Sequence, residues 1–167
     1  MVLTDYPDED LIENLRHNVR EVHALHQHAR GSGRLKARGY LWGDANVAPL
    51  YELLPLECQR QKGFDILLLA DLNFNHHCHE ALAATICLIL KWSKDARALV
   101  FFTPYRPWLL DKDMALFAVC GRKGLVVKKL LEEQTEQVMF EKDLGDETLR
   151  KTVFGYEISW SFGEEVP

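Results

Sequence analysis

The stretch that decides the fold is Phe64-Asp65-Ile66-Leu67-Leu68-Leu69-Ala70-Asp71. Its apolar run is continuous, with a glycine just before it and an acid at its end. A parallel strand that helices cover on both faces has this pattern, because neither of its faces alternates with polar residues. We therefore predict a central, parallel strand here.

The segments after this strand alternate between helical and extended patterns. His79 to Trp92 carries apolar residues at spacings of three and four, which predicts a helix. Ala98 to Thr103 predicts a second buried strand, and Met114 to Val119 lies in a further predicted helix that ends near Gly121 or Gly124. Two more strand-like patterns follow, at 125–131 and 153–162.

The segments before the central strand begin with Met1-Val2-Leu3-Thr4-Asp5, a β-type run that ends in an acid. A helix is predicted next, because apolar residues recur at spacings of three and four at Leu11, Ile12, Leu15, Val19, Val22 and Leu25. Arg30-Gly31-Ser32-Gly33 breaks this helix, and the basic stretch that continues to Gly39 is predicted to be an exposed loop.

Two elements connect this loop to the central strand. Tyr40-Leu41-Trp42-Gly43 predicts a short strand with an aromatic end, and Val47 to Gln61 predicts a helix that Pro49 starts and Pro55 interrupts. Strands and helices therefore alternate along the chain, and two strands close it. This order predicts an α/β fold with a mostly parallel sheet, helices on both faces and a terminal antiparallel pair.

Length and composition describe one globular domain over residues 1–167. Apolar residues make up 47% and charged residues 27% of the chain, which are ordinary globular values. A formal net charge of -5 argues against a nucleic-acid binder, and the longest apolar stretch, Ala81 to Leu90, is too short to span a membrane. The four cysteines lie far apart, as in proteins of the cytosol or nucleus, and we assign a cytoplasmic location.

Polar and aromatic side chains gather where the predicted strands end. They lie at Asp5, at Trp42 to Asp44, at Asp71 to His76 and at Thr103 to Trp108. In sheets of this type the ligand binds at the carboxyl ends of the strands, near the switch in strand order. We therefore predict a ligand site at this edge.

Several linked motifs cover nearly the whole chain. They are Leu3-Thr4-Asp5-Tyr6-Pro7-Asp8, Asn14-Leu15-Arg16-His17-Asn18-Val19, Tyr40-Leu41-Trp42-Gly43, Asp71-Leu72-Asn73-Phe74-Asn75-His76 and Phe102-Thr103-Pro104-Tyr105-Arg106-Pro107. Together they resemble class I S-adenosylmethionine-dependent methyltransferases. The likeness is greater to the fungal protein N-terminal and lysine methyltransferase family that acts on translation elongation factor 1-alpha, formerly nicotinamide N-methyltransferase-like.

The resemblance implies a seven-stranded Rossmann-like methyltransferase fold that lacks its first strand and glycine loop, so that the domain is incomplete at its N-terminus. The missing strand would lie between the strands that end at Asp5 and Asp71, and both would lose a hydrogen-bonding partner. An unpaired apolar strand favours aggregation. We therefore expect this chain alone to be inactive and to bind the cofactor weakly or not at all.

The resemblance also assigns roles to the strand-end residues. It implies S-adenosylmethionine as cofactor, with Asp5 accepting hydrogen bonds from the ribose, Trp42 bordering the adenine and Ala70 beside the cofactor. Asp71 and Phe74 would position the target amine of elongation factor 1-alpha or another protein. A substrate loop would contain Asn75, His76, Tyr105 and Arg106. Where this chain has Asn73, the family usually has an aliphatic residue.

Other readings stay open. The chain could methylate a small nitrogen heterocycle such as nicotinamide, or it could be a non-catalytic truncated remnant whose surface binds a partner. Asp5 could instead cap the helix that follows it, and Trp42 could be a core aromatic. Asp71 could simply end its strand, and Tyr105 with Arg106 could be solvated loop residues.

Histidines invite a metal site at two places, and we predict none. Four adjacent residues, His76, His77, Cys78 and His79, cannot all converge on one ion, and no second ligand group stands at a zinc-site spacing. A solvated position near a helix end is the commoner explanation for the other group, His23, His26 and His28.

Overall fold

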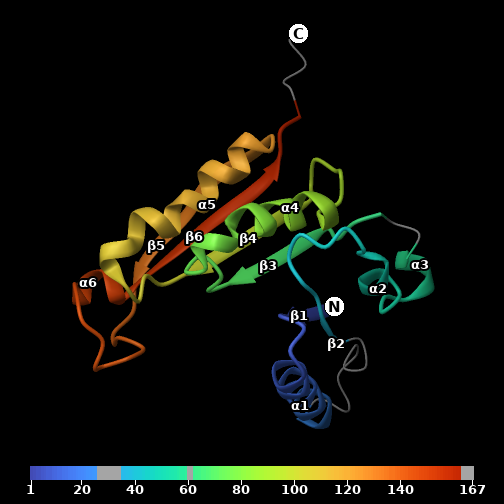
Figure 1. The fold of residues 1–167 in the computed structure, drawn as a ribbon, viewed down its shortest axis with the longest axis horizontal. Coiled ribbons are helices and arrows are strands. Elements are labelled where there is room, and N and C mark those ends of the chain that lie inside the picture. The colour runs from blue at the N-terminus through green and yellow to red at the C-terminus, as the bar shows by residue number, and fades with distance from the viewer. Residues whose placement is uncertain (26–34, 60–61, 163–167) are drawn as a thin grey trace. The chain divides into compact units, whose positions relative to one another are not determined.

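The computed structural model describes residues 1–25, 35–59 and 62–162. The chain divides into two compact units, residues 1–62 and 63–167, which are described separately (Figure 1). The helix break predicted at Arg30-Gly31-Ser32-Gly33 lies outside the described residues, as do His26 and His28. Among the described residues, no helix is both long and apolar enough to cross a membrane.

The first unit is built on two parallel strands. β1 (Val2–Asp5) pairs with β2 (Lys36–Gly39), with Asp5 opposite Gly39. The amphipathic helix α1 (Glu9–Leu25) follows β1, packs against both strands and buries Ile12 and Val19. This confirms the predicted strand-acid-helix order, because the apolar stripe of α1 faces its own small sheet.

The structure corrects the strand predicted at Tyr40-Leu41-Trp42-Gly43. β2 ends at Gly39, within the stretch that was predicted to be a loop. Its side chains alternate between exposed and half-buried positions, so no apolar run marks the strand. Tyr40 is buried just beyond it, and its hydroxyl donates to the backbone oxygen of Asp44 at 2.6 Å. The aromatic residues therefore mark the end of the strand.

Two short helices replace the single helix predicted at 47–61. α2 (Ala48–Tyr51) has Pro49 in its first turn, and α3 (Leu56–Gln59) begins directly after Pro55. Proline is tolerated at the start of a helix but interrupts its interior. The predicted roles of both prolines are thus confirmed.

The second unit is a four-stranded mixed sheet with the strand order β3-β4-β6-β5. β3 (Ile66–Ala70) runs parallel to β4 (Arg97–Phe102). β6 (Thr152–Trp160) is antiparallel to β4 and to β5 (Leu125–Gln134). A mixed α/β fold with a terminal antiparallel pair is therefore confirmed.

Two helices cover one face of this sheet. α4 (His79–Ile89) and α5 (Leu110–Arg122) pack side by side and lie over the strands in Figure 1. On β4 the covered side chains are Ala98, Val100 and Phe102, each no more than 3% exposed. The shorter helical segments are His76–Cys78, Pro107–Leu109 and α6 (Glu147–Arg150).

β3 departs from its predicted central position, because it is an edge strand of the four-stranded sheet. Leu69 is buried, but Ile66 and Leu68, on the opposite face, are 65% and 68% exposed. A continuous apolar run indicates that both faces of a strand are suited to burial. Whether the strand is central also depends on which other segments cover its faces and pair with its edges.

Candidate functional site

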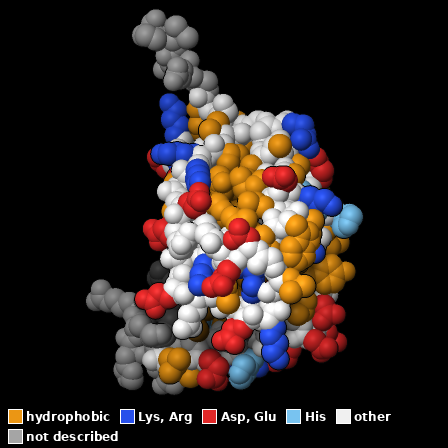
Figure 2. All heavy atoms as spheres, turned by 90° about the vertical axis from the view of Figure 1, so that its left-hand side faces the viewer, with side chains coloured by type: hydrophobic (Ala, Val, Ile, Leu, Met, Phe, Trp, Pro, Cys, Tyr) orange, Lys and Arg blue, Asp and Glu red, His pale blue; other side chains and the backbone are white. Residues whose placement is uncertain are grey.

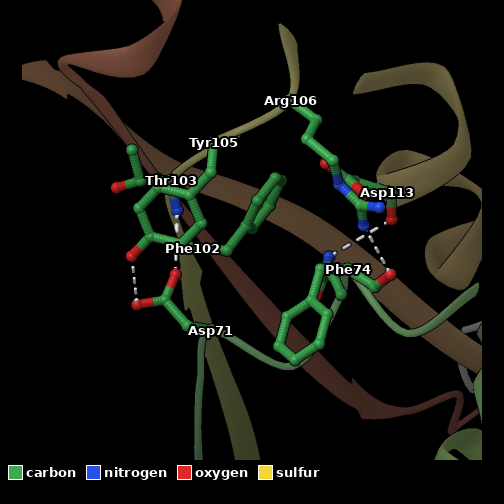
Figure 3. A pocket seen from close by; sticks show the side chains of 8 residues that line it. Asp71, Phe74, Phe102, Thr103, Tyr105, Arg106 and Asp113 are labelled. Atoms are coloured by element: carbon green, nitrogen blue, oxygen red, sulfur yellow. Dashed lines mark hydrogen bonds between the residues drawn. The ribbon is translucent and has the colours of Figure 1, made fainter. Parts of the chain in front are cut away.

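Asp71 ties together the carboxyl ends of β3 and β4. Its Oδ1 accepts a hydrogen bond from the backbone nitrogen of Thr103, and its Oδ2 accepts one from the Tyr105 hydroxyl, both at 3.1 Å (Figure 3). Asp71 has a φ of 51°, and it is the single non-glycine residue with positive φ in the described part of the chain. Such a backbone costs about 1–3 kcal/mol. These side-chain bonds help to hold it in place.

Tyr105 serves Asp71 as a hydrogen-bond donor. Burial, followed by the negative charge of Asp71 and the hydrogen bond to it, raises the pKa of Tyr105 to about 12. The phenol is therefore protonated at neutral pH, which excludes a role as general base there. Its hydroxyl also lies 3.3 Å from Sδ of Met139, in the connection between β5 and β6.

Phe74 and Arg106 form the outer side of the same site. Phe74 is 54% exposed, and its backbone oxygen accepts a hydrogen bond from Nη2 of Arg106 at 3.1 Å. Figure 3 shows both side chains beside the cavity that Asp71 borders. The structure therefore brings together four of the predicted site residues, Asp71, Phe74, Tyr105 and Arg106.

A small cavity lies between these groups, and most of its lining follows β3 and β4. The volume of the cavity, counted as the space that the centre of a water molecule can occupy, is about 20 Å3. This is enough for one group of the size of a water molecule. Asp71, Asp113 and Asn73 supply oxygen acceptors around it, and Phe74 and Tyr105 supply rings. A single amine or ammonium head group suits this lining, because its N–H bonds need acceptors.

Asp113 was missed by the sequence analysis. It lies in the first turn of α5, is 4% exposed, and its Oδ1 lies 2.6 Å from Nε2 of His76. Acids in a first helical turn are common, because they interact favourably with the helix dipole. Its position at i+3 from Leu110 and i−3 from Leu116, on the apolar face of α5, was the available signal.

Asn73 lies deeper in the cavity wall, where it is 1% exposed. Its Nδ2 donates to the backbone oxygen of Asp113 at 3.3 Å, and its own backbone oxygen lies 2.8 Å from Nε2 of His79. Within the described residues its Oδ1 has no hydrogen-bond partner. Such buried orphan acceptors are uncommon. Asn73, at a position where the resemblance implies an aliphatic residue, thus places a polar amide inside the cavity wall.

A wide, open groove continues from the cavity. Phe74, Tyr105 and Arg106 line both, and the groove extends to Trp108 and to the connection between β5 and β6 at Leu144. Figure 2 views the molecule from the side that carries α6 and shows hydrophobic side chains exposed between charged ones. Trp108 and Leu144 are 63% and 79% exposed.

The remaining predicted residues lie elsewhere. Ala70 ends β3 and Asn75 precedes the turn at His76, and neither belongs to the cavity lining. Trp42 is half-buried beyond β2 in the first unit. Across the described segments, no group of three His, Cys, Asp or Glu side chains is arranged to hold a metal ion.

Asp5 does not cap α1. Oδ1 of Asp8 instead accepts hydrogen bonds from the backbone nitrogens of Asp10 and Leu11, at 3.1 and 3.3 Å. Asp5 accepts one from the backbone nitrogen of Tyr6 at 2.7 Å, and its exposed carboxylate ends β1. The cap role is therefore filled by another residue, and a ligand role for Asp5 stays open.

Comparison with known proteins gives relatives over almost the whole chain. A protein of Emericella nidulans is 45% identical over 159 residues, which are 95% of this chain and 60% of the relative. One of Aspergillus fumigatus is 44% identical over 96% of the chain and 60% of its own length. One of Schizosaccharomyces pombe is 39% identical over 95% and 58%. All three are called protein N-terminal and lysine N-methyltransferase efm7.

The chain spans about 60% of the length of the curated relatives it matches. No family model matches it.

Proposed function

We propose that this chain is part of an enzyme that methylates a protein amine. The premise is that the chain is homologous over 95% of its length to fungal protein N-terminal and lysine N-methyltransferases. The observation that carries this proposal is the 45% identity to such a relative. Elongation factor 1-alpha is the acceptor we propose from the resemblance, and the cytoplasm is the proposed compartment.

The finer fold that we propose is the Rossmann-like methyltransferase sheet. The parallel pair β1-β2 and the order β3-β4-β6-β5 support it. In a seven-stranded sheet, one further strand would pair with the outer edge of β3. That strand would supply hydrogen-bond partners to the open edge of β3.

The cofactor that we propose is S-adenosylmethionine, which supplies an activated methyl group. The residues of the first unit fit its polar half, because the exposed Asp5 carboxylate is a hydrogen-bond acceptor suited to ribose hydroxyls. Trp42 offers an aromatic side wall for an adenine ring. Ala70 is small and ends β3, so a bulky ligand can approach the strand end closely.

In the substrate site, we propose that Asp71 and Phe74 position the target amine. Asp71 is held by two hydrogen bonds and Phe74 provides an apolar wall. Methyl transfer from a sulfonium is an in-line displacement, so the protein must align a neutral amine and exclude water. Tyr105 and Arg106 fix the loops through Asp71 and Phe74, His76 orients Asp113, and Asn75 begins the adjoining turn.

A protein acceptor is favoured over a small heterocycle by the open groove beside the cavity. The test is to incubate a complete protein that contains this chain with methyl-labelled S-adenosylmethionine and cell extract. We expect label in protein, with elongation factor 1-alpha among the products. Label confined to low-mass products would reject the protein acceptor, and no label at all would favour a non-catalytic binding module.

A further inference from the structure

The groove beside the cavity shares Phe74, Tyr105 and Arg106 with the proposed substrate site and extends beyond it to Trp108 and Leu144. Its volume is about 630 Å3, within the range of binding sites for small ligands and short peptide segments. All the residues that line it belong to the second unit. Its geometry therefore depends on that unit alone.

Contacts between two connections hold the groove in shape. The ring of Tyr105, after β4, packs edge-on against the ring of Phe140, before β6, with 5.3 Å between their centroids. The backbone oxygen of Phe140 also accepts a hydrogen bond from Nη2 of the buried Arg150. The two connections that carry groove residues are thus tied to each other and to α6.

Gly145 gives a second attachment between the same connections. It has a φ of 102°, and a Cβ there would lie 3.1 Å from atoms of both Pro107 and Trp108. A residue without a side chain lets the two loops approach closely. Trp108 therefore lies close against Gly145, while 63% of Trp108 stays exposed.

The groove carries exposed apolar side chains. Trp108 and Leu144 are the most exposed of these, and Phe74 joins the groove to the cavity. Exposed apolar surface of this kind marks interaction sites, and tryptophan is prominent among residues that dominate binding energy. The rim carries charges of both signs, on Arg106, Lys142 and Asp143.

The occupant follows from the connection between groove and cavity. The cavity admits one head group, so the rest of any larger acceptor must leave it past Phe74, which lines both spaces. We propose that the groove binds the segment of the acceptor polypeptide beside its target amine, and that an apolar side chain of this segment packs on Trp108 and Leu144. This inference rests on the proposed function, because a protein acceptor is assumed.

The test uses two fluorescein-labelled heptapeptides that contain one lysine and differ in having leucine or serine two residues after it. Binding to a complete protein that contains this chain is measured by fluorescence anisotropy. We expect the leucine peptide to bind at least about tenfold more tightly, since burying a leucine side chain supplies that much. Trp108→Ser and Leu144→Ser should abolish the difference.

Matched controls are available for both variants. Trp92 and Leu56 are 67% and 78% exposed and line neither space, so Trp92→Ser and Leu56→Ser should keep the preference. Melting temperatures show that each variant is folded. Equal binding of both peptides by the unmodified complete protein would overturn the inference. So would a concentration-dependent dimer that Trp108→Ser dissociates, because the groove would then hold a second copy.

A kinetic measurement separates this inference from the proposed function. In an active protein that contains the chain, Trp108→Ser should raise KM for the protein acceptor at least fivefold and leave kcat nearly unchanged. Methyl transfer to protein with an unchanged KM would reject the groove and retain the function. A peptide preference without any methyl transfer would retain the groove's selectivity and reject the function.

Discussion

The hydroxyl of Tyr105 lies 3.1 Å from Oδ2 of Asp71 and donates a hydrogen bond to it across the ends of two neighbouring strands. This bond joins the loop after β4 to the residue that ends β3. It thereby fixes one side of the cavity in which we place the target amine.

The first prediction concerns this pair at high pH. The pKa of Tyr105 is raised to about 12 in the folded chain, above its ordinary value of 10.0, chiefly by burial. Its contribution to stability is therefore complete below pH 10 and is lost as the pH rises toward 12. In an absorbance titration at about 295 nm, Tyr105→Phe should remove one late-titrating phenol. An unchanged late phase would show that Tyr105 titrates normally.

The second prediction concerns Asn73. Asn73→Leu removes a buried acceptor that has no partner among the described residues, and it fills a similar volume. Because an unsatisfied buried polar atom costs about 1–3 kcal/mol, we expect urea unfolding to show stability that is unchanged or higher by about 1 kcal/mol. A loss of more than about 2 kcal/mol would indicate that Oδ1 of Asn73 has a hydrogen-bond partner in solution.

The third prediction compares two glycines. Gly145→Ala should destabilise the second unit by about 1–2 kcal/mol, because its φ is 102° and the added Cβ would press on Pro107 and Trp108. Gly121→Ala is the control, since it lies in α5 with nothing within 4 Å of a Cβ, and it should stabilise by about 0.5–1 kcal/mol. Thermal unfolding measures both, and equal effects would contradict the loop packing.

The fourth prediction distinguishes a cofactor-binding role for Asp5 from the helix-capping role of Asp8. In a protein form that binds S-adenosylmethionine, Asp5→Ala should lower the affinity at least about tenfold, as expected when a charge-assisted hydrogen bond is lost. Asp8→Ala should instead cost about 1 kcal/mol of stability and leave the affinity unchanged, because Asp8 caps α1. Calorimetric titration together with urea unfolding distinguishes them. The reverse pattern would exchange the two roles.

The fifth prediction concerns the 167-residue chain by itself. It spans about 60% of the length of its relatives, and the edge strand β3 exposes Ile66 and Leu68. We expect aggregation at micromolar concentration in light scattering, and weak or undetectable binding of S-adenosylmethionine in calorimetry. Tight, stoichiometric binding would refute this expectation.

Several elements were predictable from sequence because their signals are local. α1, α4 and α5 carry apolar residues at helical spacing, and β4 and β6 lie close to the predicted ranges. β2 was misplaced, since its polar side chains at a sheet edge leave no apolar pattern. The hydrophobic pattern of a segment indicates which of its residues are buried. Prediction from this pattern therefore fails for a short strand that buries few side chains.

By itself, the sequence determined the order of strands and helices, the acids that end β1 and β3, and the likeness to methyltransferases. The tertiary structure alone decided that Asp113 of α5 and Asn73 face one cavity with Asp71, and that β3 has an open edge in the described sheet. The physical reason is that periodicity records how one segment meets its surroundings. Which segments meet one another is fixed by strand pairing and side-chain packing across the whole unit.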